Sequence, residues 1–204
     1  SLGNNITALP GELFYGCSAL HSVNIPTAAT EIGYNCFDGC KSLSSKLTLT
    51  NVKSIGQGAF GSCESLSEVD FGDKLVSINL FAFSGCSKLQ AAHLPNTLQS
   101  IAAHAFDGCS AMTHTTIGSG TTTIGEDAYA NCPKLTTIRC LAVTPPTVES
   151  YGGGNGSMIP DRPASYPHIF DADIPNRRIK VPNISYEEYI SAQTWSYYAS
   201  QIEK

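Results

Sequence analysis

The eight cysteines are the residues whose type and spacing first suggest chemistry. Six of them recur every 23 residues, at Cys17, Cys40, Cys63, Cys86, Cys109 and Cys132. Cysteine can form disulfides, bind zinc or act as a nucleophile. A zinc site needs two closely spaced pairs or a cluster with histidine, and the pair Cys36 and Cys40 stands alone. We therefore expect no metal site at the cysteines.

Motifs that build catalytic sites are missing from the sequence. It contains no Gly-x-Ser-x-Gly elbow, no His-Glu-x-x-His, no Gly-x-x-x-x-Gly-Lys-Ser/Thr loop and no Gly-x-Gly-x-x-Gly fingerprint opening a strand-to-helix unit. The paired acids Glu187 and Glu188 suit the first turn of a helix, where negative charge favours the helix dipole. We expect a protein that is not an enzyme and binds no cofactor.

Composition narrows the classes of partner. The 204 residues include 12 Lys+Arg and 17 Asp+Glu, a formal net charge of −5, and 42% are hydrophobic. A negative balance without a long basic run argues against nucleic acid and anionic membrane surfaces as partners. No apolar run approaches the roughly 18 residues that span a bilayer. A soluble protein with a sizeable core is expected.

The elements that position these residues follow the same 23-residue period as the cysteines. An aliphatic column, a ring column and a second aliphatic column accompany the cysteine column. They are Leu9, Ile32, Ile55, Ile78, Ile101 and Ile124; Phe14, Phe37, Phe60, Phe83, Phe106 and Tyr129; and Leu20, Leu43, Leu66, Leu89, Met112 and Leu135. Internal repeats of this length are typical of solenoids.

Each repeat divides into a strand and a turn. Apolar residues alternate at Val23-x-Ile25, Val69-x-Phe71 and Ile138-x-Cys140, which predicts short half-buried strands. Ile55, Ala59, Phe60 and Cys63 are spaced as in an amphipathic helical turn. The second repeat departs from this pattern, because Leu47 and Leu49 are apolar where Lys46 and Thr48 are expected. We predict a bulge there.

One strand and one turn cannot bury an apolar stripe alone, so the repeats must stack. We predict an α/β solenoid with a parallel sheet on its concave side and short helical turns on its convex side. Stacked coils bring equivalent Cα atoms to about 4.8 Å, but their Cβ vectors run parallel, which disfavours disulfides. We expect a buried ladder of free thiols, with Cys36 and Cys140 in apolar columns; partial pairing is the alternative.

The columns Ile-Gly-x-x-Ala-Phe-x-Gly-Cys and Leu-x-x-Val-x-Ile-Pro resemble the BspA-type bacterial leucine-rich repeats. The resemblance covers about residues 2–140 and continues weakly into the tail. It implies a right-handed leucine-rich repeat fold in an exported or cell-surface protein. Several members of the family are implicated in adhesion to host matrix proteins or to other cells. The resemblance therefore implies a protein partner, either a host matrix protein or a microbial surface protein.

Outward positions of the predicted strands are the candidate partner-binding residues, because extended partners bind the concave faces of solenoids. They are Ser22, Asn24, Glu68, Asp70, His93, His114, Thr116 and Arg139. Glu68, Asp70, His93 and His114 fall on three successive coils, where a shared metal ion is one interpretation and a solvated polar face is the other. We favour the polar face, because no dedicated loop assembles a coordination geometry.

The tail leaves the repeat period. Residues 1–143 are predicted to form the solenoid, and residues 144–204 a degenerate last repeat with a glycine-rich insertion and a helical cap, all in one continuous domain. Ser185 and Glu188 form a capping-box pattern, which predicts a helix from Tyr186. The tail aromatics allow a second hypothesis, a glycan-stacking platform. They are Tyr151, Tyr166, Tyr186, Tyr189, Trp195, Tyr197 and Tyr198. A structural spacer for a further domain is the third.

Overall fold

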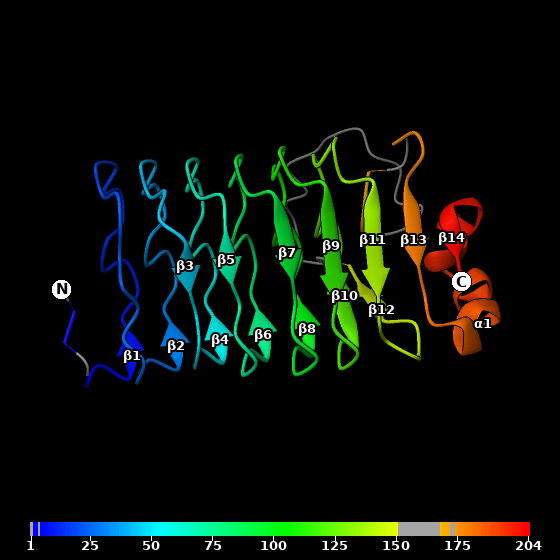
Figure 1. Cartoon of the computed structure of the whole chain (residues 1–204), viewed down its shortest axis with the longest axis horizontal. Coiled ribbons are helices and arrows are strands. Elements are labelled where there is room, and N and C mark those ends of the chain that lie inside the picture. The colour runs from blue at the N-terminus through cyan, green and yellow to red at the C-terminus, as the bar shows by residue number, and fades with distance from the viewer. Residues whose placement is uncertain (1, 4, 151–167, 172–173) are drawn as a thin grey trace.

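A stack of coils runs along the long axis of the molecule, with the N-terminus at one end and the only α-helix of the described chain at the other (Figure 1). The computed structural model describes residues 2–3, 5–150, 168–171 and 174–204. Most coils contribute short strands to two faces of the stack, and the columns of repeated apolar residues fill the space between them. The predicted parallel-strand solenoid with a 23-residue period is confirmed.

One face is a seven-stranded parallel sheet, which we call the isoleucine sheet. Its strands are β1 (Ala8–Leu9), β2 (Glu31–Ile32), β4 (Ser54–Ile55), β6 (Ser77–Ile78), β8 (Ser100–Ile101), β10 (Thr123–Gly125) and β12 (Thr147–Glu149). Ile32 pairs with Ile55 and Ile55 with Ile78, so the aliphatic column is also the register of the sheet. This sheet was not predicted, because strands of two residues carry no alternation that a sequence can reveal.

The other face is the sheet that the alternating pattern predicts, which we call the histidine sheet. It comprises the pair β3 (Leu47–Thr48) and β5 (Val69–Asp70), followed by the five strands β7 (Ala91–His93), β9 (His114–Ile117), β11 (Thr137–Cys140), β13 (Arg178–Lys180) and β14 (Ile202–Glu203). All strand pairs in it are parallel. In Figure 1 these strands lie side by side along the front of the stack.

The second repeat is out of register with its neighbours, as its sequence indicates. Leu47 pairs with Val69, only 22 residues away, and both Leu47 and Leu49 are buried while Lys46 is exposed. One extra residue therefore precedes β3. The strand predicted at Val23-x-Ile25 is wrong, since residues 21–26 form no strand in the described chain.

The predicted helical turns are tight hydrogen-bonded turns without a helix. The N–H of Cys63 donates to the carbonyl of Phe60 at 3.3 Å, an i to i+3 bond, but the N–H of Phe60 donates to the carbonyl of Ala82 in the next coil at 2.8 Å. Because this link recurs in every coil, the N–H groups that would extend a helix are used between coils instead. The turns thus link neighbouring coils along one edge of the stack, which we call the turn edge.

Two ladders run through the core. The six rings of the aromatic column stack with centroids 5.1 to 5.4 Å apart. Beside them the thiols of five cysteines, from Cys40 to Cys132, each donate to a carbonyl of the preceding coil, as Cys63 does to Phe37 at 3.2 Å. All eight cysteines lie in the described chain and are free, which confirms the unpaired ladder, and seven are buried. Burial raises the pKa of the Cys86 thiol to about 12, so these thiols are protonated structural groups.

The C-terminal cap contains η1 (Asn183–Ser185), α1 (Tyr186–Ser191) and η2 (Trp195–Gln201). The helix begins at Tyr186 as predicted, but no capping box forms, because the hydroxyl of Ser185 is buried and makes no hydrogen bond in the described structure. β13 and β14 extend the histidine sheet into the cap. Of the helices described, none is long and apolar enough to cross a membrane.

Candidate functional site

The candidate binding residues are carried by successive strands of the histidine sheet. Glu68 and Asp70 flank Val69 of β5, and His93, His114 with Thr116, and Arg139 follow on β7, β9 and β11. The side chains of Glu68, Asp70, His93 and Arg139 are exposed, and those of His114 and Thr116 are half-buried. Ser22 and Asn24 are exposed too, but they lie in the first coil where no strand forms. The structure therefore brings six of the eight residues onto one sheet face.

A groove interrupts the histidine sheet between β5 and β7. These two strands are not paired in the described chain, whereas β3 pairs with β5 and β7 with β9. A cavity of about 500 Å³ lies at this position, and its lining includes Lys46, Glu68, Asp70, His93 and His114. Sequence reasoning missed Lys46, although the shift of Leu47 and Leu49 already places its side chain outside the core.

The groove contains an exposed ion pair and a carboxylate that is held by a backbone hydrogen bond. Nζ of Lys46 lies 2.6 Å from Oε1 of Glu68, but both side chains are more than half exposed, and such pairs add little to stability. Oδ1 of Asp70 accepts the N–H of Gly72 at 3.1 Å, which holds that carboxylate at the end of its strand. The rings of His93 and His114 lie 5.1 Å apart, tilted by 49°. A carboxylate thus shares the groove with two imidazoles that lie side by side at an angle.

The metal interpretation of these four residues finds no support in the geometry. Within the described ranges there is no group of three or more His, Cys, Asp and Glu side chains that could hold a metal ion. The acids and the histidines are spread along the sheet face rather than converging on one point.

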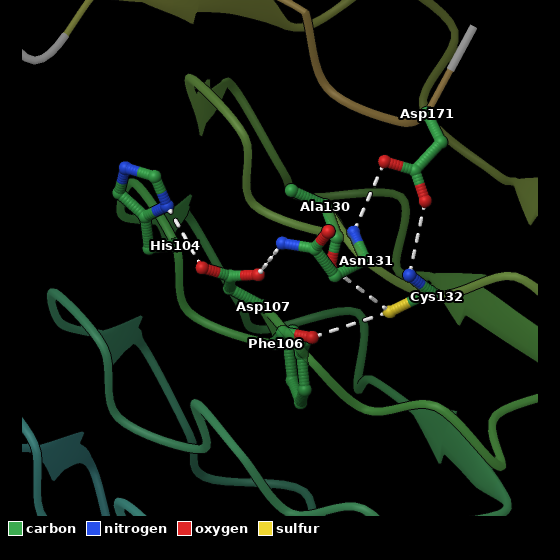
Figure 2. Close-up of polar contacts among 7 residues, drawn as sticks. All are labelled: His104, Phe106, Asp107, Ala130, Asn131, Cys132 and Asp171. Atoms are coloured by element: carbon green, nitrogen blue, oxygen red, sulfur yellow. Dashed lines mark hydrogen bonds and ion pairs between the residues drawn. The ribbon is translucent and has the colours of Figure 1, made fainter. Parts of the chain in front are cut away.

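A second polar cluster lies on the turn edge of the last coils, where Figure 2 shows its contacts. The carboxylate of Asp107 lies 3.3 Å from Nδ1 of His104 and accepts the side-chain amide of Asn131 at 2.7 Å. The carboxylate of Asp171 accepts the N–H groups of Asn131 and Cys132, both at 3.0 Å. The hydrogen bond to Asp107 raises the pKa of His104. This cluster ties the tail to the last coil.

The thiol of Cys132, which adjoins that cluster, is not an activated nucleophile. Burial raises the pKa of the Cys132 thiol to about 12, and its Sγ donates to the carbonyls of Phe106 and Ala130 (Figure 2). Because its pKa is raised, this thiol stays protonated, and only the thiolate is a nucleophile.

Three of the seven tail aromatics are buried and cannot take part in a glycan-stacking platform. Trp195 and Tyr198 are buried, with 1% and 0% exposure, and Tyr189 is buried as well. Their polar atoms bind the backbone, as when the indole N–H of Trp195 donates to the carbonyl of Pro146 at 2.8 Å. Tyr197 is exposed, Tyr186 is partly buried, and Tyr151, Tyr166 and the glycine-rich insertion lie outside the described residues. Burial thus removes Tyr189, Trp195 and Tyr198 from the proposed stacking surface, and the hypothesis remains a prediction for the other rings.

Two solved structures share this fold. A leucine-rich repeat protein from Bacteroides ovatus is 27% identical, with a TM-score of 0.52, and the match covers 59% of this chain and 42% of that chain. The leucine-rich repeat protein of T. pallidum is 27% identical, with a TM-score of 0.58, and the match covers 65% of this chain and 62% of that one. The chain thus matches less than two thirds of the length of each. No curated protein matches it significantly.

The sequence model of the BspA type leucine-rich repeat region accounts for the repeats themselves. It matches in six copies, over residues 1–72 and 44–145. These ranges contain the complete columns of rings, cysteines and aliphatic residues that the structure stacks into ladders. The chain belongs to the BspA type leucine-rich repeat family.

Proposed function

We propose that this protein is a noncatalytic extracellular or cell-surface module that binds a protein partner through the histidine sheet. The observation that carries the proposal is the groove between β5 and β7, where the otherwise regular face opens beside Glu68, Asp70, His93 and His114. Extended sheet faces of solenoids are suited to protein partners because they present many side chains in fixed register. The family adds the expectation of adhesion to a host matrix protein or a microbial surface protein.

The groove favours a basic side chain of the partner. Glu68 is already paired with Lys46, whereas the carboxylate of Asp70 accepts the N–H of Gly72 and stays exposed. The volume of about 500 Å³ is large enough for a lysine or arginine side chain entering from the face of the sheet. Charge pairs at the rim of an interface chiefly raise the association rate and make it sensitive to salt. Binding should therefore weaken as the salt concentration rises.

The test compares two sets of substitutions on opposite sheets. The groove variant carries Glu68→Gln, Asp70→Asn, His93→Gln and His114→Gln, which remove charge with little change of shape. The control variant carries Ser54→Ala, Ser77→Ala and Ser100→Ala on the isoleucine sheet, where these polar side chains are half-buried. Label-free binding to immobilised matrix proteins and bacterial surface proteins is measured at low and high salt.

We expect saturable, salt-sensitive binding of the wild type to at least one of these proteins. The groove variant should bind about tenfold more weakly or worse, as the loss of central interface residues does, and the control should bind like the wild type. Equal affinities of the groove variant and the wild type would reject the histidine sheet as the binding face. If the wild type binds none of the immobilised proteins, the structural-spacer hypothesis is favoured.

A further inference from the structure

A column of left-handed residues runs along the turn edge of the solenoid. Its members are Glu12, Asn35, Gly58, Phe81, His104 and Asp127, all with φ between 47° and 61°. Glycine and asparagine adopt this conformation readily, but a bulky ring at positive φ is uncommon. Phe81, with φ of 55°, is the bulkiest of the six. Backbone strain of this kind persists where something is gained from the side chain, which directs attention to this ring.

The two faces of the Phe81 ring have different neighbours. One face stacks on the imidazole of His104 in the following coil, with centroids 4.8 Å apart and the planes inclined by only 9°. In the preceding coil the same column holds Gly58, which has no side chain to offer. His104 therefore covers one face of the Phe81 ring. No side chain of the same column covers the other face, because the column holds Gly58 there. Phe81 remains only partly buried.

A notch of about 260 Å³ lies at this point. It is lined by Asn35, Asp38, Gln57, Gly58, Gly61, Ser62, Phe81 and Ser84, from three successive coils. Gly58 and Gly61 form its floor. A Cβ on Gly58 would collide with Oδ1 of Asn35, and a Cβ on Gly61 would lie 2.8 Å from Oδ1 of Asp38. The amide oxygen and the carboxylate therefore lean over the two glycines, into the space that the missing side chains leave.

The spacing of the walls fits one ring. Asn35 and Phe81 are two coils apart, which at about 4.8 Å per coil separates them by roughly 9.5 Å. A ring that packs on Phe81 at a van der Waals distance of about 3.5 to 4.0 Å therefore has the side-chain amide of Asn35, which leans over Gly58, on its far side. Such a ring would pack one face on Phe81 and present its edge to the polar groups of the notch.

The chemistry of the lining points to a sugar rather than to an aromatic or charged ligand. Carboxylate, amide and hydroxyl oxygens accept hydrogen bonds from the hydroxyls of a ligand, and the exposed aromatic face accepts an apolar C–H face. A pyranose offers both around one ring. The residues that line the notch, all of them described, include no lysine or arginine, while Asp38 is acidic. Anionic sugars are therefore disfavoured. We infer that this notch binds a neutral pyranose residue of a glycan.

The inference is independent of the protein-binding proposal. The notch lies on the turn edge and shares no lining residue with the groove of the histidine sheet. It also differs from a platform of tail aromatics, because none of those rings lines it. The loss of one site should leave the other unchanged.

The test uses two substitutions that remove the site in opposite ways. Phe81→Gly deletes the ring at a backbone position that glycine adopts without strain. Gly58→Asn fills the floor with the residue that already occupies the same left-handed position one coil earlier. Phe81→Tyr preserves the aromatic face. Tyr197→Ala, which removes an exposed ring from the cap, is the matched control.

Isothermal titration calorimetry with glucose, galactose, mannose, N-acetylglucosamine and their oligomers measures affinity, with sialylated and sulfated sugars for contrast. We expect a neutral saccharide to bind the wild type, Phe81→Tyr and Tyr197→Ala alike. Phe81→Gly and Gly58→Asn should each weaken binding by about tenfold or more. Cooperative urea unfolding of each variant shows that the solenoid is intact.

Three results would overturn the inference. If the wild-type protein binds no neutral saccharide, neutral sugars are not the ligand of the notch. Equal affinities of Phe81→Gly, Gly58→Asn and the wild type would move the sugar elsewhere on the molecule. Tighter binding of sialylated or sulfated sugars than of neutral ones would contradict the charge argument based on Asp38.

Discussion

The two ends of the array are built from the same columns but are covered differently. At the N-terminal end Phe14 stacks on Phe37 with centroids 5.2 Å apart, yet its ring is only partly buried and Cys17 is exposed. At the other end Tyr129 packs against Phe170, and Trp195 contacts Phe170 edge-on. The difference shows that a residue in a stacked column gains its stabilisation from neighbours on both sides, because each repeat contacts only the adjacent ones.

The C-terminal end also shows how hydrogen bonds between coils can be replaced. The hydroxyl of Tyr198 accepts the N–H groups of Ile169 and Phe170 at 3.2 and 3.1 Å and donates to the carbonyl of Phe170 at 3.0 Å. The hydroxyl of Tyr189 donates to the carbonyl of Ala142 at 2.8 Å. Side chains of the cap thus satisfy backbone groups that a further coil would otherwise bind.

The largest expected effect is on stability, and it compares a ring in the middle of the aromatic column with the ring at its N-terminal end. Phe83→Ala, in the middle of the array, should lower the free energy of unfolding by about 3 to 5 kcal/mol, because the ring is fully buried between Phe60 and Phe106. Phe14→Ala should cost clearly less, since its ring stacks on one neighbour and stays partly exposed. Urea unfolding of both variants measures the two losses. Equal losses would contradict the dependence on two-sided stacking.

An intermediate effect is expected at the capped end. Tyr198→Phe leaves the buried N–H groups of Ile169 and Phe170 without an acceptor and should destabilise the protein by about 1 to 3 kcal/mol. Tyr197→Phe is the matched control, because Tyr197 is the exposed neighbour, and its effect should stay within about 0.5 kcal/mol. Unfolding free energies of both variants decide the outcome. A neutral Tyr198→Phe would show that water satisfies these groups.

The smallest expected effect on stability is at Cys17, whose thiol should nevertheless differ greatly in reactivity from the buried thiols. Cys17 is exposed and should be alkylated quickly by iodoacetamide in the native protein, whereas the seven buried thiols should react only after unfolding. Burial raises the pKa of the Cys40 thiol to about 11 even one coil further in. Cys17→Ser should abolish the fast reaction and change the unfolding free energy by less than about 0.5 kcal/mol. Mass spectrometry counts the modified sites, and a second fast site would mean that the ladder opens.

The sequence could predict whatever repeats with the period of the chain. The columns of rings and cysteines predict the stack, the parallel orientation of Cβ vectors predicts free thiols, and the apolar pair Leu47 and Leu49 predicts the shifted register. It also predicts that Glu68, Asp70, His93 and His114 lie on successive coils of one face. These features follow from local order, because stacking copies each position onto its equivalent in the next coil.

Tertiary structure alone decided the features that depend on how neighbouring coils meet. The isoleucine sheet forms because two-residue strands pair only once the coils are stacked, and the groove beside β7 is a missing pair that no single repeat encodes. The burial of Trp195 and Tyr198 depends on where the tail folds back. The notch at Gly58 requires side chains of three coils at once. Sequence specifies the repeated unit, while the contacts between unlike units create the candidate sites, because only there does the regular packing leave space.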